Sequence, residues 1–104
     1  MEEITIDVGV YTALQVDLTG YDFTGVEKLV FTIKNAANVA LPVIVEREFS
    51  TPKVHQINIT PEESISLYSS AVYDFTKVLL DGKCYKETTN GKIVLRKGVG
   101  ECIE

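Results

Sequence analysis

The residues that could carry out catalysis are few in this chain. His55 is its single histidine, and a Ser, Cys or Thr nucleophile needs such a base within hydrogen-bond reach. In a strand, His55 would face the same way as Ile57 and Ile59, so we expect it at the margin of the core. A ligand or catalytic role is the alternative, but no Cys or second His lies near it in the sequence. We therefore interpret His55 as structural.

Carboxylates suggest two further kinds of chemistry. Asp17, Asp22 and Glu27 surround the turn-rich stretch DLTGYDFTG and could hold a weakly bound cation, although Asx side chains that stabilise turns explain them more simply. Paired acids of the kind that glycosidases use occur only as sequence neighbours, at Glu2-Glu3 and Glu62-Glu63. The first pair is terminal and the second begins a helix, where negative charge suits the helix dipole. Neither pair predicts a cleft, and no CxxC, HExxH or calcium-loop spacing is present.

The two cysteines, Cys84 and Cys102, form one possible pair, which is weak support for a disulfide in a chain without a secretion signal. We expect two reduced thiols that act as small apolar side chains, with a disulfide as the alternative. Lys86 would share a strand face with Cys84 whereas Lys83 would not, so we expect an unreactive thiol. Gly98-Val99-Gly100 lacks the rest of a phosphate-binding loop. The sequence therefore predicts no catalytic, cofactor-binding or metal-binding residue, and a protein that is not an enzyme.

Charge and hydropathy narrow the range of partners. Acidic residues outnumber basic ones 15 to 10 and the net charge is −5, which opposes nucleic-acid binding because that binding depends on Lys and Arg. No apolar run approaches the roughly 18 residues of a membrane span, and the acidic start Met1-Glu2-Glu3 is unlike a signal peptide. We expect synthesis in the cytoplasm, no cofactor and no membrane insertion.

Apolar and polar residues alternate with a period of two along most of the chain, which is typical of half-buried strands. With 104 residues and 45% apolar content, we predict one domain over residues 1–104. Turn-forming residues recur at short intervals between the strands. The predicted fold class is all-β, an immunoglobulin-like antiparallel β-sandwich with one short helical turn. The expected strands cover residues 4–8, 14–18, 28–34, 39–46, 54–60, 72–80, 83–88 and 92–97.

Three local features sharpen this prediction. Pro42 places its strand at a sheet edge or at a bulge, because proline has no amide hydrogen for the ladder. The run Thr60-Pro61-Glu62-Glu63 is a capping box that begins a short helix over residues 61–69. Strict alternation in the strand over 72–80 would bury Lys77, so we expect a bulge near Thr76-Lys77 that switches the faces.

Two dipeptides predict tight hairpins. Asp81-Gly82 and Asn90-Gly91 are typical of two-residue type I′ turns, whose central residues both need positive φ. They would separate the strands over 72–80, 83–88 and 92–97. Beyond them, Gly98–Ile103 is expected to form a last short strand or strap.

Charges are unevenly distributed along the chain. Acids dominate the first thirty positions, and six of the ten basic residues lie in the C-terminal third. These six are Lys77, Lys83, Lys86, Lys92, Arg96 and Lys97. Solvated strand faces are the ordinary explanation. The alternative is that acidic and basic surfaces of neighbouring copies meet in an assembly, which a measurement of self-association against salt concentration would test.

Three segments carry a resemblance to a known family. They are DLTGYDFTGVEKLVFTIKN at Asp17–Asn35, INITPEES at Ile57–Ser64 and AVYDFTKVLLDGKCYKETTNGKIVLRKG at Ala71–Gly98. Together with an early alternating strand, this order resembles the small β-sandwich modules of tailed phages and prophages, similar to the immunoglobulin-like N-terminal domain of baseplate upper proteins. The resemblance implies a virion part, often oligomeric, without a catalytic set. The chain ends soon after the sandwich, so a tail accessory or adaptor is expected as readily as a baseplate position.

The leading hypothesis is therefore a non-catalytic structural or assembly module of a phage or prophage particle, in the tail or baseplate. It would act by protein–protein contact with other virion proteins or with copies of itself as a homo-oligomer. The alternative is an immunoglobulin-like binding module that recognises a cell-surface glycan or protein, for which the five Tyr and four Phe residues offer aromatic rings.

Overall fold

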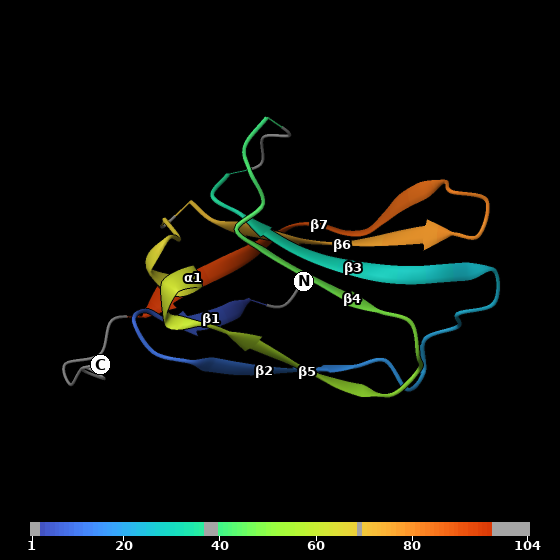
Figure 1. Ribbon diagram of the computed structural model, residues 1–104, viewed down its shortest axis with the longest axis horizontal. Helices are drawn as coiled ribbons and strands as arrows, with labels where there is room; N and C mark the ends of the chain where they lie inside the picture. Colours follow the sequence, from blue (N-terminus) through green and yellow to red (C-terminus); the bar gives the residue numbers. More distant parts are fainter. Residues whose placement is uncertain (1–2, 37–39, 69, 97–104) are drawn as a thin grey trace.

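A computed structural model describes residues 3–36, 40–68 and 70–96, with the backbone alone described at residues 88–90. These residues form seven strands and one short helix (Figure 1). The strands are β1 (Ile4–Asp7), β2 (Thr12–Asp17), β3 (Val26–Lys34), β4 (Val45–Phe49), β5 (Val54–Ile59), β6 (Val72–Leu79) and β7 (Cys84–Arg96), and the helix is α1 (Pro61–Ile65). The expected strand or strap at Gly98–Ile103 lies outside the described residues.

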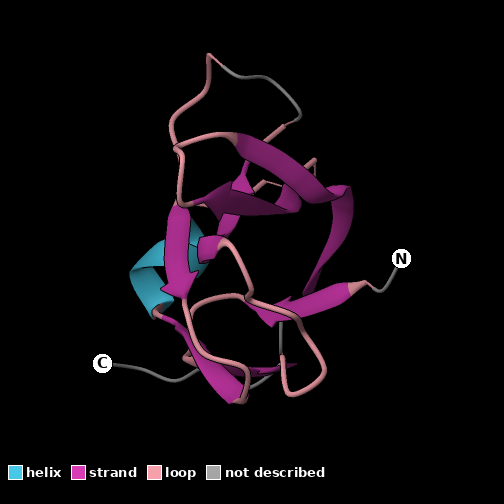
Figure 2. Cartoon of the chain, turned by 90° about the vertical axis from the view of Figure 1, so that its right-hand side faces the viewer, coloured by secondary structure: helices cyan, strands magenta, loops and turns pink. Residues whose placement is uncertain are grey.

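The strands form a five-stranded sheet in the order β1-β7-β6-β3-β4 and a two-stranded sheet of β2 and β5. The prediction of an all-β fold is confirmed. The prediction of a purely antiparallel arrangement is wrong at one pair, because β1 runs parallel to β7. Figure 2, which looks along the long axis of the molecule, shows the larger sheet curling around the interior. Among the described residues no helix is long enough to cross a membrane, since α1 has five residues.

The inner faces of the two sheets share one hydrophobic core. Phe31 and Ile33 from β3 and Ile57 and Ile59 from β5 are almost completely buried. The Phe31 ring lies 5.1 Å from that of Phe75, centroid to centroid. Burying a side chain of this size stabilises the fold by about 1.5–3 kcal/mol, so this alternating set of apolar residues holds the two layers together.

Helix α1 connects β5 to β6 and begins as predicted. Thr60 is the N-cap: its hydroxyl accepts from the Glu63 amide at 3.1 Å, and the Glu63 carboxylate accepts from the Thr60 amide at 3.0 Å. The helix ends at Ile65, earlier than the expected 61–69. Ser64 is fully buried, accepting from the Gly9 amide at 2.9 Å and donating to the Pro61 carbonyl at 2.8 Å. The helix thereby fixes the turn between β1 and β2.

The strand expected at residues 39–46 is displaced toward the C-terminus. Strand β4 begins at Val45, and Pro42 lies before it in an irregular segment. The Ile44 amide donates to the Ile33 carbonyl at 2.9 Å, so pairing with β3 begins only after the proline. The prediction that Pro42 lies within a strand is wrong, although β4 does form an edge of the five-stranded sheet.

The two predicted hairpin turns have different outcomes. The turn at Asp81-Gly82 exists, but the Leu79 amide donates to the Lys83 carbonyl at 2.8 Å, which leaves a three-residue loop ending in Gly82 with φ of +89°. The prediction of a turn at Asn90-Gly91 is wrong, because β7 continues from residue 84 to residue 96. Gly91 instead lies opposite Tyr73, where a Cβ would stand only 2.3 Å from the tyrosine ring.

The pairing of β6 with β7 does shift register between Phe75 and Thr76, close to the predicted bulge, but the predicted switch of the β6 faces is wrong. Strand β6 keeps its alternation against β3, with Phe75 opposite Phe31 and Lys77 opposite Leu29, so Lys77 stays on the inner side. The register shifts that do occur between β6 and β7 place the extra residues on β7. Lys77 tolerates this position because its Nζ lies 3.1 Å from the Glu87 carboxylate.

Candidate binding site

A concave site lies at the end of the molecule that holds α1. It is a pocket of about 590 Å³ between the end of β3, the segment that leads into β4 and the segment that follows α1. Its lining residues are Asn35, Ala36, Leu41, Pro42, Ile44, Ile65, Ser66, Tyr68 and Ser70. None of them carries a charge, so the pocket suits an apolar or neutral polar group.

Asn35 at the end of β3 holds the two walls of the pocket together. Its side-chain amide donates to the Ser66 carbonyl at 3.0 Å and accepts from the Tyr68 amide at 2.7 Å. Its backbone carbonyl accepts from the Ser70 hydroxyl at 2.5 Å. The segment after α1 is also anchored to the interior of the protein, because Leu67 and Ala71 are buried in the core. Hydrogen bonds of Asn35 thus connect the end of β3 to the segment after α1.

Two large apolar side chains of this pocket face solvent. Ile65 is 64% exposed and Tyr68 is 66% exposed. Val43, next to the lining residue Pro42, is also exposed. An exposed large apolar group needs no explanation when it stands alone, but several of them around one pocket make the pocket a candidate for binding.

The opposite end of the molecule carries a cluster of aromatic and charged side chains that contact one another. Tyr21 and Phe23, in the loop before β3, meet edge to face with ring centroids 4.8 Å apart. Burial, and then the negative charge of Glu87, raise the pKa of Tyr21 above its ordinary value of 10.0. Lys77 lies between Glu87 and the ring of Tyr85, 5.8 Å from the ring centroid. The rings and charged groups of this cluster thus find their main partners within the cluster.

His55 lies at the margin of the core, as its strand register predicts. It is half-buried, and its ring stands 4.8 Å from that of the core residue Phe49. Its Nε2 lies 2.8 Å from the Thr51 carbonyl oxygen and 3.3 Å from the Thr51 hydroxyl. A carbonyl only accepts, so this nitrogen carries the proton. It therefore cannot act as a base toward the hydroxyl in this arrangement.

The acidic residues of the DLTGYDFTG stretch serve as turn caps. Asp17 accepts from both the amide and the hydroxyl of Thr19, at 3.0 and 2.6 Å, and Asp22 accepts from the Thr24 amide at 2.9 Å. The threonine hydroxyls, followed by the amides, lower the pKa of both carboxyls below their ordinary value of 3.8. Across the described ranges, no three or more His, Cys, Asp or Glu residues are placed to hold a metal ion.

The other residues that the sequence analysis considered for chemistry do not come together in the described structure. Cys84 is exposed at the start of β7, with its Sγ 3.8 Å from the Gly82 carbonyl, whereas Cys102 lies outside the described residues. Of the acidic pair at the helix start, Glu62 is exposed, and Glu63 pairs with Arg47 at 3.0 Å. Glu2 and the Gly98–Gly100 segment also lie outside the described residues.

The uneven distribution of charge is balanced by pairing within the chain. Lys92 lies 3.3 Å from Glu3 and Arg96 lies 2.6 Å from Asp7, because the parallel pair of β1 and β7 brings the acidic start beside the basic end. Lys77, Lys83 and Lys86 also have acidic partners within 4.0 Å. Of the six C-terminal bases, only Lys97 lies outside the described residues, so this unevenness does not by itself require a second copy.

Sequence reasoning missed the pocket for two reasons. The sequence predicts a strand over residues 39–46, whereas β4 begins at Val45 and the preceding Leu41, Pro42 and Ile44 line the pocket. The sequence predicts a helix over residues 61–69 that would include Tyr68, whereas the helix ends at Ile65 and Tyr68 follows it. No local pattern in either segment signals the pocket, because it forms only where the segments meet.

Comparison with known proteins yields no relative. No family model matches the chain, and no curated protein and no solved structure matches it at a significant level. The function must therefore be argued from the site.

Proposed function

We propose that this chain is a non-catalytic module that acts by protein–protein contact, as a structural or assembly part of a phage or prophage tail or baseplate. The observation that supports contact is the uncharged pocket with Ile65 and Tyr68 exposed at its rim. A partner would fill the pocket with an apolar side chain and cover the tyrosine ring, a residue type enriched at the energetic centres of interfaces. The phage assignment rests on the resemblance of the sequence segments.

Strand order supports the immunoglobulin-like part of this proposal. In variable-type immunoglobulin domains, a sheet containing strands G, F, C and C′ faces a sheet containing B and E. The order β7-β6-β3-β4 opposite β2-β5 fits that arrangement when the strands are lettered along the chain. Modules of this kind are used widely for adhesion and assembly, so the architecture agrees with a contact role.

A glycan-binding module is the second candidate, because an exposed tyrosine beside Asn35, Ser66 and Ser70 combines an aromatic ring with polar groups. Those polar groups are already engaged within the chain. The Asn35 amide bonds to two backbone groups, Ser70 donates to Asn35, and the Ser66 hydroxyl donates to the Glu62 carbonyl at 3.0 Å. A sugar needs several free hydrogen-bonding partners, so the pocket favours a protein.

The test uses variants that alter the rim without altering the core. Ile65→Ser and Tyr68→Ser change exposed side chains, and Leu80→Ser is the matched control, because Leu80 is 71% exposed at the far hairpin. Binding to purified tail and baseplate proteins encoded by neighbouring genes would be measured by calorimetry. We expect one of them to bind and the rim variants to weaken binding about tenfold or more. Equal losses in Leu80→Ser, or no binding to any of them, would contradict the proposal.

A glycan array completes this test. We expect no selective binding by the chain. Selective binding that Tyr68→Ser abolishes would replace the first candidate with the second.

A further inference from the structure

The edges of the two sheets differ in how they are protected. An edge strand presents unpaired backbone groups and usually carries charges, prolines or bulges that prevent association with another strand. Strand β4 carries Glu46, Arg47 and Glu48 in succession. Strand β1 has only four residues, and Asp7 at its end is paired with Arg96.

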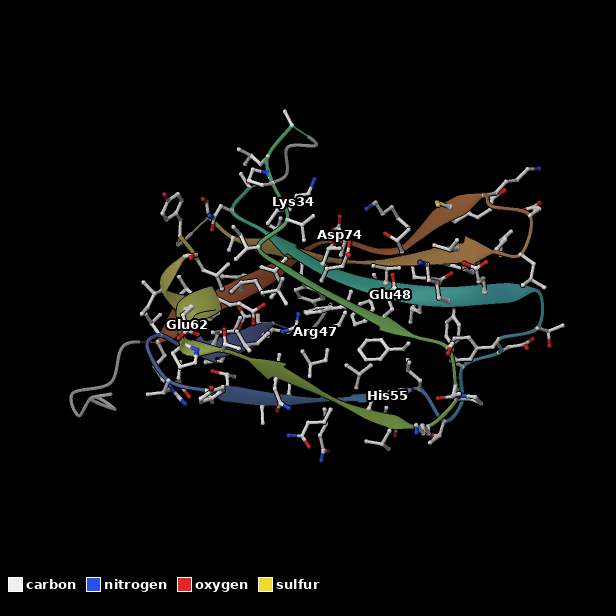
Figure 3. All side chains as sticks on the ribbon, in the orientation of Figure 1. Lys34, Arg47, Glu48, His55, Glu62 and Asp74 are labelled. Carbon is white, nitrogen blue, oxygen red and sulfur yellow. The ribbon has the colours of Figure 1, made fainter. Side chains whose placement is uncertain are left out.

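Strand β5 is protected by a side chain from the neighbouring sheet. Arg47, labelled in Figure 3, projects from β4. Its guanidinium donates to the Asn58 carbonyl at 2.9 Å and to the Glu63 carboxylate at 3.0 Å. The gap between β4 and β5 is therefore closed by a guanidinium group, which satisfies the outward carbonyl of Asn58.

Strand β2 has no such protection among the described residues. Its six residues, TALQVD, include no proline and no basic residue, and its register against β5 is regular from Thr12 to Asp17. Its one charge, Asp17, stands at the C-terminal end and caps the following turn.

The register fixes which backbone groups of β2 face away from β5. The Leu18 amide donates to the Lys53 carbonyl at 3.1 Å, and hydrogen-bonded pairs alternate along an antiparallel ladder. The even-numbered residues of β2 therefore bond to β5, and the amides and carbonyls of Ala13, Gln15 and Asp17 point to the open edge. No residue in the described ranges hydrogen-bonds to these backbone groups.

The outer face beside this edge is almost free of charge. Ala13, Gln15 and Asp17 on β2 and Val54, Gln56 and Asn58 on β5 are all exposed. Asp17 is the single ionisable group among them. Neither desolvation nor repulsion between like charges would strongly oppose the approach of another uncharged strand.

We propose that β2 pairs antiparallel with β2 of a second copy, about a two-fold axis at Gln15, so that two two-stranded sheets become one four-stranded sheet. This inference rests on the proposed role in protein–protein contact and names one partner, a second copy of this chain. An isologous interface of this kind closes as a dimer.

Side-chain chemistry selects this register. With Gln15 on the axis, each Ala13 lies opposite Asp17 of the other copy, and the two Gln15 side chains lie opposite each other. All outward backbone groups of the three residues then gain partners. Moving the axis to Asp17 would oppose two carboxylates directly, which destabilises a pair of strands, and moving it to Ala13 would leave Asp17 unpaired.

The salt dependence separates this dimer from one built on acidic and basic patches. Each copy carries a net charge of −5, so two copies repel at long range, and salt screens that repulsion. The β2 dimer should therefore become tighter as salt rises. An interface of complementary charges would become weaker.

The experiment places charges on the axis and beside it. Gln15→Lys puts two ammonium groups opposite each other, and Gln56→Lys, on the neighbouring strand of the same face, is the matched control. The molar mass would be measured by light scattering over a range of protein and salt concentrations. The wild type should approach twice its 11.5 kDa. Gln15→Lys should raise the dissociation constant about fivefold or more, and Gln56→Lys should change it much less.

Mixing provides a test that misfolding cannot imitate. Gln15→Glu alone should also dimerise poorly, whereas an equal mixture of Gln15→Lys and Gln15→Glu should regain the dimer. In hydrogen exchange, the amides of Ala13, Gln15 and Asp17 should become protected as the dimer forms.

Several results would overturn the inference: a wild type that is monomeric at every concentration and salt, equal weakening by both lysine variants, or a mixture that stays monomeric. In each case the proposed function still stands if Ile65→Ser and Tyr68→Ser weaken binding to a tail protein. Conversely, a β2 dimer that binds no tail or baseplate protein would contradict the proposed function and leave the strand pairing intact.

Discussion

The two sheets have opposite kinds of outer face. The five-stranded sheet carries ion pairs across its strands, including Lys28 with Glu48 at 2.9 Å and Lys86 with Asp74 at 3.0 Å. The two-stranded sheet carries amides and small side chains, such as Gln15, Gln56 and Asn58. Exposed ion pairs contribute little stability, but burying them against another chain would be costly. The charged face is thus suited to remain in water, and the uncharged one is suited to meet a partner.

The inner faces of the two sheets are both apolar, and substitutions there should lower the free energy of unfolding the most. Phe31→Ala removes a fully buried ring between Tyr73 and Phe75 and should lower the free energy of unfolding by about 3–5 kcal/mol. Denaturant titration measures this loss. Thr32→Ala, on the opposite face of β3, is the control and should cost far less. Equal losses would show that the charged face is as deeply packed as the core.

Gly91→Ala should have the next largest effect. A Cβ there would stand 2.3 Å from the buried Tyr73 ring, and overpacking of this kind costs about 1–3 kcal/mol. Gly20→Ala is the control, because no atom lies within 4 Å of the position that its Cβ would occupy.

A double-mutant cycle checks the cause of the Gly91 effect. Tyr73→Leu removes the ring, so Gly91→Ala should cost less in that background than in the wild type. Additive losses would show that the contact with Tyr73 is not the reason for a glycine at position 91.

Gly91 also shows where sequence reasoning reached its limit. Asn90-Gly91 has the composition of a hairpin turn, and nothing local distinguishes such a turn from a strand glycine that makes room for a ring. The partner ring, Tyr73, lies eighteen positions earlier, and only the pairing of β6 with β7 brings it into contact. Asp81-Gly82 was recognisable because a loop glycine with positive φ is a local requirement.

Other features that depend on residues close together in the sequence were predictable for the same reason. The capping box at Thr60 and the alternation that buries Phe31 and Ile57 depend on residues within one element. The parallel pairing of β1 with β7 and the uncharged pocket depend on where distant segments meet. The pocket in particular combines three segments, and no pattern within any one of them predicts it.

Arg47→Ala should have an effect on stability similar to that of Gly91→Ala, and a separate effect on assembly. It removes hydrogen bonds to the Asn58 carbonyl and the Glu63 carboxylate, which should cost about 1–3 kcal/mol. It also leaves the β5 edge as open as the β2 edge. If a β2 dimer forms, this variant should therefore grow beyond it, since two open edges on one sheet allow chains of copies.

Light scattering at increasing protein concentration measures that growth. Glu46→Ala, on the same strand, keeps the guanidinium in place and should keep the size distribution of the wild type. An Arg47→Ala variant with unchanged assembly would show that the arginine does not protect the edge.

The smallest expected effect belongs to the charged face. Arg96, through its hydrogen bond and then its charge, lowers the pKa of Asp7 below the ordinary value of 3.8. Because the folded-state pKa is the lower one, this pair stabilises the fold above pH 3.8 and loses that contribution as the pH falls through the folded-state value. Asp7→Asn should therefore lower stability slightly at neutral pH and match the wild type in acid. Salt should narrow the neutral-pH difference, because both side chains are partly exposed. A difference that persists unchanged into acid would mean that Asp7 acts through packing, and the charged face would then resemble the uncharged one more closely than its ion pairs indicate.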